Sequence, residues 1–144
     1  MLLFGVCIND IEKAGINWEN VVGMLKKYDH DRYSDFLDDM EENSAENDSR
    51  DIEFWFDQYE SGGRSGLGAF LYDVIREQEK VEIDIDDPDG VYIGISAAAP
   101  WEFHPSVRNL SEEQFAAMIS KYICQITDTE IEIRWWKVDD DLDW

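Results

Sequence analysis

Apolar and polar residues recur along the chain with the periods of strands and helices, and turn residues separate the segments. This pattern predicts nine elements. The predicted strands are 2–8, 51–58, 81–86, 91–96 and 130–138. The predicted helices are 18–28, 31–42, 67–78 and 111–125. Strand 2–8 is apolar on both faces, so we expect it in the centre of a sheet.

Alternation with period two supports the strand predictions for 51–58, 81–86 and 91–96. In 51–58 the expected core face carries the apolar residues of even number, Ile52, Phe54 and Phe56. Its other face carries Glu53, Trp55 and Asp57. Segments 81–86 and 91–96 flank the turn sequence Asp87-Pro88-Asp89-Gly90, so we expect them to form a β-hairpin.

Cap residues and apolar stripes support the helices. Asn17 is the expected N-cap of helix 18–28, and Ser111 with Gln114 forms a capping box for the last helix. Helix 31–42 has an apolar stripe at helical spacing: Tyr33, Phe36, Leu37 and Met40. On a helical wheel its acids cluster on the opposite side: Asp31, Asp35, Asp38, Asp39 and Glu42. The stripe is therefore expected in the core and the acids in solvent.

The element order β-α-α-β-α-β-β-α-β indicates an α+β fold. We expect residues 1–144 to form a single domain, with an about five-stranded, mostly antiparallel sheet packed by four helices. If all the helices cover one face, the other face is open and mixes acids with aromatics. The residues expected there are Glu53, Trp55, Asp57, Glu82, Asp84, Asp86, Tyr92, Glu130, Glu132 and Trp136. Alternatively, a helix or a second copy of the chain covers these aromatics.

Composition adds a strong negative charge to this picture. The chain has 34 Asp and Glu against 12 Lys and Arg, a formal net charge of −22. Three blocks hold nearly all of the excess: 29–60, 77–89 and 138–144. Binding to bare nucleic acid or to an anionic membrane is disfavoured, because both need Lys and Arg. Such blocks indicate recognition patches, although acidic patches also keep small proteins in solution.

No motif in the sequence points to catalysis. The two histidines, His30 and His104, lie in no zinc-binding arrangement. Segment 84–90 resembles a calcium loop only superficially, because Ser96 stands where a bidentate Glu is needed. The glycine-rich segment 62–68 lacks the Lys-Ser/Thr pair of a phosphate-binding loop. We therefore predict no enzymatic activity, no metal and no cofactor.

The cysteines and the first residues bear on location. Cys7 and Cys124 are expected to be buried thiols in a reducing cytoplasm, with a disulfide between them as the alternative. Residues 2–8 lack the charged flank and the cleavage site of a signal peptide. No apolar run reaches the ~20 residues that span a bilayer. A cytoplasmic protein that does not enter membranes is therefore expected.

Charge, aromatics and the lack of catalytic motifs together favour a protein that acts by binding. We expect an inhibitor that imitates phosphates and occupies the basic groove of a nucleic-acid-handling protein, such as a nuclease or nuclease complex. Phage anti-CRISPR and anti-restriction DNA mimics are proteins of this kind. One alternative is an immunity protein for a basic nuclease toxin. Another is an adaptor that dimerises through its aromatic face.

The predicted contact residues are acids of the first two blocks together with three aromatics: Asp31, Asp35, Asp38, Asp39, Glu42, Glu53, Asp57, Glu82, Asp84, Asp86, Trp101, Phe103 and Trp136. Trp101 and Phe103 belong to an irregular loop, 97–110, that two prolines stiffen. The alternative for these two side chains is a lid folded onto the core.

Overall fold

The computed structural model describes residues 2–43, 49–61, 64–85, 92–96 and 110–137. Its helices are α1 (Ile8–Ala14), α2 (Trp18–Tyr28), α3 (His30–Asn43), α4 (Ser49–Asp57), α5 (Leu67–Glu79) and α7 (Glu112–Ile123). Its strands are β1 (Leu2–Cys7), β2 (Glu60–Ser61), β3 (Arg64–Ser65), β4 (Asp84–Ile85), β5 (Tyr92–Ser96) and β6 (Arg134–Lys137). The mixture of helices with an antiparallel sheet confirms the α+β prediction.

The main sheet has four strands in the order β4-β5-β1-β6, and every pair is antiparallel. Strand β1 lies inside the sheet, as its apolar faces predict. β4 pairs with β5 as the predicted hairpin requires, and the turn 87–90 lies outside the described residues. The prediction of five strands in one sheet is wrong, and β2 with β3 forms a separate two-stranded ribbon.

The main error concerns 51–58, which lies in helix α4 and not in a strand. Its apolar residues fit both periods, and the structure uses the helical one. Ile52, Trp55, Phe56 and Tyr59 stand at i, i+3, i+4 and i+7, and all four are buried or half-buried. Phe54, predicted inward, is 66% exposed, whereas Trp55, predicted outward, packs on the core.

Most of the helix predictions are confirmed, with differences at their ends. The Asn17 side chain accepts a hydrogen bond from the Asn20 backbone N–H at 3.1 Å, and Ser111 forms the predicted capping box with Gln114. Helix α1 was not predicted. It follows β1 directly. Ile8 is the last residue of the apolar run 2–8 and also the first residue of the helix, and Ile11 is buried one turn later.

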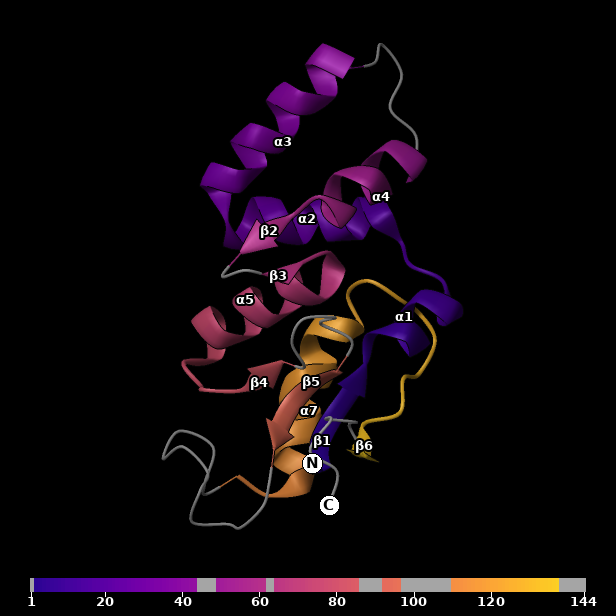
Figure 1. The fold of residues 1–144 in the computed structure, drawn as a ribbon, viewed down its shortest axis with the longest axis vertical. Helices are drawn as coiled ribbons and strands as arrows, with labels where there is room; N and C mark the ends of the chain where they lie inside the picture. The colour runs from indigo at the N-terminus through magenta and orange to yellow at the C-terminus, as the bar shows by residue number, and fades with distance from the viewer. Residues whose placement is uncertain (1, 44–48, 62–63, 86–91, 97–109, 138–144) are drawn as a thin grey trace.

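Two helices, α5 and α7, cover one face of the sheet (Figure 1). The predicted helices do not all cover this face, because α2 and α3 lie beyond α5, together with α4 and away from the four-stranded sheet. Aromatic contacts connect these helices to α5. The ring centroid of Phe56 on α4 lies 5.2 Å from that of Phe70 on α5 and 6.3 Å from that of Phe36 on α3. Helix α3 therefore forms one end of an elongated molecule.

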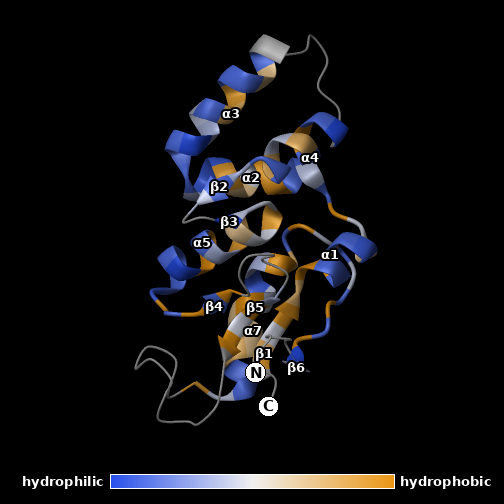
Figure 2. Cartoon of the chain, in the orientation of Figure 1, coloured by the Kyte–Doolittle hydropathy of each residue, from blue (hydrophilic) through white to orange (hydrophobic). Residues whose placement is uncertain are grey.

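Hydropathy follows this division (Figure 2). Strands β1 and β5 are mostly hydrophobic, whereas α3 alternates between hydrophilic and hydrophobic residues along its length. Both cysteines are free thiols, as predicted, but only Cys7 is buried. The prediction that Cys124 is buried is wrong, because it lies on the exposed side at the end of α7.

The sheet face opposite α7 has four strands, because 51–58, which was predicted to contribute to it, is a helix. One row across its strands consists of Asp84, Gly94, Gly5 and Arg134. Trp136 lies over the glycines and donates its indole N–H to the Gly5 carbonyl at 2.9 Å. Its ring is 5.4 Å from that of Tyr92, and the Arg134 guanidinium stacks 3.5 Å from its centroid. Contacts within the chain therefore already half-bury this aromatic pair.

Candidate protein-binding surface

Helix α3 carries a row of exposed acidic residues. Four of its predicted contact residues are exposed: Asp31, Asp35, Asp38 and Asp39. Glu41 is also exposed and extends the row. Glu42 lies within α3, but its side chain lies outside the description. The predicted placement of the acids in solvent is confirmed for the four residues that the structure describes.

The fold holds α3 by its opposite side. Asp29 accepts a hydrogen bond from the Arg32 backbone N–H at 3.2 Å and so caps the start of the helix. Phe36 is 5% exposed, and Tyr33 and Met40 pack partly against the core. Leu37, predicted to belong to this stripe, is instead 48% exposed and lies in the solvent-facing part of the helix.

The guanidinium of α3 does not pair with the described acidic residues of the same helix. The single base of α3, Arg32, points its guanidinium to the ring of Tyr59, at 4.8 Å, and donates to the Glu60 carbonyl at 3.0 Å. Asp31, Asp35 and Asp38 form no hydrogen bond or ion pair within the described ranges. Their carboxylates are therefore accessible to solvent and to a binding partner.

Asp39 differs from its neighbours although it is exposed. Its carboxylate accepts a hydrogen bond from the Trp55 indole N–H at 2.7 Å. The same indole packs edge-on against Phe36 at 5.2 Å. Asp39 therefore holds α3 against α4, a role that the helical wheel could not show because Trp55 was placed on the wrong side of its segment.

A second group of carboxylates forms where α4 approaches α1. Glu53 and Asp57 are exposed and stand one helical turn apart on α4. Partial burial of Glu12, and then the charges of Asp57 and Glu53, raise the pKa of Glu12 above its usual value. Phe54 projects into solvent from the same turn. Sequence reasoning missed Glu12 because it assigned no helix to 8–14.

Replacing Glu12 with glutamine is expected to stabilise the fold slightly at pH 7. The raised pKa means that the folded state binds this proton more readily than the unfolded state, so the charged carboxylate costs stability above that pKa. The gain should be below about 0.5 kcal/mol, because solvent screens the three charges. It should shrink as the pH falls through the raised pKa. Urea unfolding at pH 7 and pH 4 in low salt measures both effects.

Glu113→Gln on α7 is the control for this measurement, since Glu113 is also exposed and lies in another part of the fold. A gain for Glu12→Gln that is equal at both pH values would contradict the like-charge explanation. So would an equal gain for Glu113→Gln.

The remaining predicted contact residues do not join this surface. Asp84 lies on the edge strand β4, and Trp136 lies on the sheet face, both far from α3 (Figure 1). Glu82 follows α5 and pairs with Arg76 at 3.7 Å. Asp86, Trp101 and Phe103 lie outside the described residues. The predicted site is therefore divided: one group of acids lies on α3, and Glu53 and Asp57 form another where α4 approaches α1.

The exposed anchors Leu37 and Phe54 were not predicted. A helical wheel drawn for 49–57 would have found Phe54, because it falls opposite Ile52, Trp55 and Phe56. Among the residues that the structure describes, no group of three or more His, Cys, Asp or Glu is arranged to hold a metal. In the same ranges, no helix has the length and apolar character to cross a membrane.

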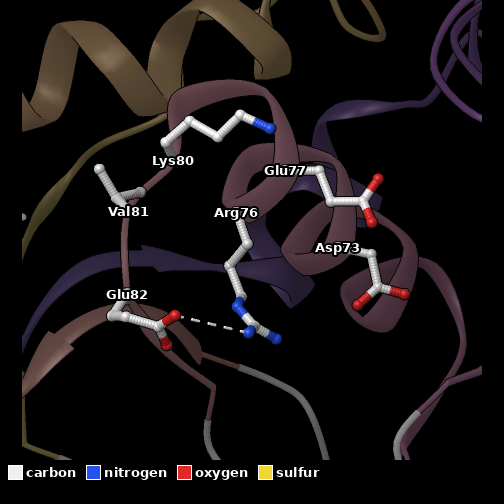
Figure 3. Close-up of a pocket in the computed structure, with 6 residues that line it drawn as sticks. All are labelled: Asp73, Arg76, Glu77, Lys80, Val81 and Glu82. Carbon is white, nitrogen blue, oxygen red and sulfur yellow. Dashed lines mark ion pairs between the residues drawn. The ribbon is translucent and has the colours of Figure 1, made fainter.

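A hollow of about 340 Å³ lies beside the C-terminal half of α5 (Figure 3). Charged side chains line most of it, including Asp73, Arg76, Glu77 and Lys80. Arg76 reaches across to Glu82 and forms the ion pair drawn there. Such walls favour a charged or polar group over an apolar ligand.

Comparison with known proteins gives no relative. No family model matches the chain, and neither a curated protein nor a solved structure matches it. Function must therefore be argued from the surface itself.

Proposed function

We propose that the chain is an inhibitor that acts by binding, and that the end formed by α3 and α4 docks into the basic groove of a nucleic-acid-handling protein. The observation that carries the proposal is the row of exposed carboxylates Asp31, Asp35 and Asp38, on a helix at one end of the molecule, which have no partner among the described residues. A row of like charges with no counter-charge destabilises its own helix slightly. A cationic partner would remove that cost on binding.

The spacing supports a phosphate mimic. Residues four apart on a helix rise about 6 Å along its axis, which is comparable with the repeat of a phosphate backbone. Asp31 and Asp35 stand at this spacing, and Asp38 follows on the same side. Long-range attraction from a net charge of −22 would speed the encounter with a basic protein and would weaken in salt.

Apolar residues at this end can contribute binding free energy that exposed charges do not. Leu37 and Phe54 are 48% and 66% exposed and lie on α3 and α4, the two helices that carry the acids. Buried aromatic anchors contribute most of the free energy of many interfaces, whereas exposed charges mainly determine orientation and association rate. We infer that steering acids surround a small number of contact residues.

The partner proposed is a basic protein such as a nuclease or nuclease complex, in the manner of phage anti-defence DNA mimics. Neither nucleic acid itself nor a membrane is the proposed target. The exposed Phe54 beside two carboxylates also favours the second candidate, an immunity protein, because dedicated tight complexes rely on such anchors. A toxin gene adjacent to the gene for this chain would favour that candidate.

The test is displacement of nucleic acid. The immobilised chain captures proteins from a bacterial lysate, and a salt gradient elutes them. Each captured protein is then bound to fluorescent DNA or RNA and titrated with the free chain. We expect displacement of the nucleic acid and a loss of affinity of at least about tenfold between 50 and 200 mM salt. A captured partner that keeps its nucleic acid and its activity would contradict inhibition by mimicry.

A further inference from the structure

A second hollow, of about 210 Å³, lies close to the start of α3. Its walls come from the end of α2, the first turn of α3, the segment 59–61 and the side of α5. Tyr28, Tyr59 and Phe70 line it, with Tyr59 and Phe70 almost entirely buried, and Asp29, Asp73 and Glu77 contribute carboxylates. Asp73 and Glu77 also line the hollow shown in Figure 3, so the two hollows adjoin along α5.

The chain itself shows what this aromatic wall accepts. The guanidinium of Arg32 lies 4.8 Å from the centroid of the Tyr59 ring. A guanidinium is attracted electrostatically to the face of an aromatic ring. Arg32 is tied to this position by its hydrogen bond to the Glu60 carbonyl, so it occupies one wall of the hollow.

The carboxylates are arranged for a second cation. The Tyr59 hydroxyl donates to Oδ2 of Asp73 at 2.9 Å, which orients that carboxylate beside the ring. Burial, and then this hydrogen bond and the Asp73 charge, raise the pKa of Tyr59, so the hydroxyl remains a donor. Glu77 stands one turn further along α5, is exposed, and has no side-chain partner in the described ranges.

We propose that this hollow receives an arginine side chain of the basic partner, with its guanidinium between Asp73 and Glu77. This inference rests on the proposed function, and it names the anchor that the partner supplies. A planar guanidinium can bridge two carboxylates with directed hydrogen bonds, whereas an ammonium acts as a point charge. The carboxylates on the rim exclude an anion.

The position fits a single docking surface. The hollow includes Asp29 and Arg32, which cap and begin α3, so it adjoins the first turn of the helix that carries the acidic row. A partner that lies along Asp31 and Asp35 would therefore reach the hollow from the same side of the α2–α3 junction. Steering by α3 and anchoring beside α5 would then act in one complex.

The test uses a tri-arginine peptide, with tri-lysine as the comparison, titrated into the intact chain by calorimetry. The test variant is Asp73→Asn with Glu77→Gln, in which the asparagine oxygen still accepts the Tyr59 hydrogen bond. The matched control is Asp128→Asn with Glu113→Gln, which removes the same charge from exposed positions elsewhere. We expect the test variant to bind tri-arginine at least about tenfold more weakly and the control less than about twofold more weakly.

Arg32→Gln provides a test with the opposite sign. It leaves the Tyr59 ring open and removes a like charge, so affinity for tri-arginine should rise by about threefold or more. Lys13→Gln, at an exposed position on α1, is its control and should change affinity less. Absence of tri-arginine binding by the unaltered chain, equal loss in test and control variants, or equal binding of tri-lysine would each overturn the proposal.

The two proposals fail separately. If Asp73→Asn with Glu77→Gln leaves displacement of nucleic acid from the captured partner intact, the arginine pocket is wrong and the acidic α3 surface can still be right. If the unaltered chain binds tri-arginine in the hollow but displaces nucleic acid from no captured protein, the pocket stands and the proposed inhibition is wrong.

Discussion

Gly94→Ala is expected to destabilise the fold by at least about 3 kcal/mol, at the upper end of what overpacking usually costs. Gly94 faces Gly5 across the pairing of β5 with β1. A Cβ atom on Gly94 would lie 2.0 Å from the Phe4 carbonyl oxygen and 2.8 Å from the Gly5 Cα. Both obstacles are backbone atoms in the sheet interior, so no side chain can move aside. The free energy of unfolding in urea, followed by circular dichroism, measures the effect.

Gly23→Ala is the matched control, and its expected effect has the opposite sign. Gly23 lies in the middle of α2, and a Cβ there would meet nothing within 4 Å. Alanine should therefore stabilise the chain by about 0.4–1 kcal/mol, because it restricts the unfolded state and favours helix. If Gly94→Ala were as stable as the unaltered chain, the close approach of β1 and β5 would be wrong.

Simultaneous reversal of Asp31, Asp35 and Asp38 to lysine is expected to weaken binding of the basic partner by about 100-fold or more. Each reversal replaces an attraction by a repulsion worth on the order of 1 kcal/mol, and about 1.4 kcal/mol is a factor of ten in affinity. None of the three side chains has a partner within the described residues, so the helix should keep its structure. Competition with labelled nucleic acid measures the affinity, and circular dichroism measures the fold.

Asp39 is omitted from this set because its reversal would also break the hydrogen bond from Trp55. The control reverses Glu113, Asp128 and Glu130, which are exposed outside the α3 surface and change the net charge by the same amount. Equal weakening by both triple variants would mean that overall charge, and not the α3 surface, governs binding. Unchanged binding by the α3 variant would leave α3 as a solvated face.

The segment 51–58 shows where pattern reasoning reaches its limit. Ile52 and Phe56 are buried or half-buried in either a strand or a helix, so they do not discriminate between the two. Phe54 and Trp55 distinguish the two structures. A strand would bury Phe54 and expose Trp55, whereas the helix exposes Phe54 and packs Trp55 on the core. Helix α4 buries Trp55 because Phe36, Phe56 and the Asp39 carboxylate surround its indole, and these contacts come from distant parts of the chain or from the helix itself.

The candidate surface was predictable in part. The acidic side of α3 follows from the spacing of five carboxylates opposite an apolar stripe, and that property is local to 31–42. The hollow lined by Tyr59 and Asp73 was not predictable, since it needs α2, α3 and α5 to meet. Sequence spacing relates residues within one helix, but it carries no information about which other helix lies beside it.

Local pattern was enough to predict four of the helices, the interior position of β1, the β4–β5 pairing and the side of α3 that carries the acids. These features depend on local periodicity, capping and turn chemistry. Contacts between distant segments were needed to show that 51–58 is helical, that Leu37 and Phe54 are exposed, and that the acids of α3 lie apart from those of β4. The reason is that burial is a property of the packed layers, and long-range contacts at α4 and α5 select among local patterns of similar strength.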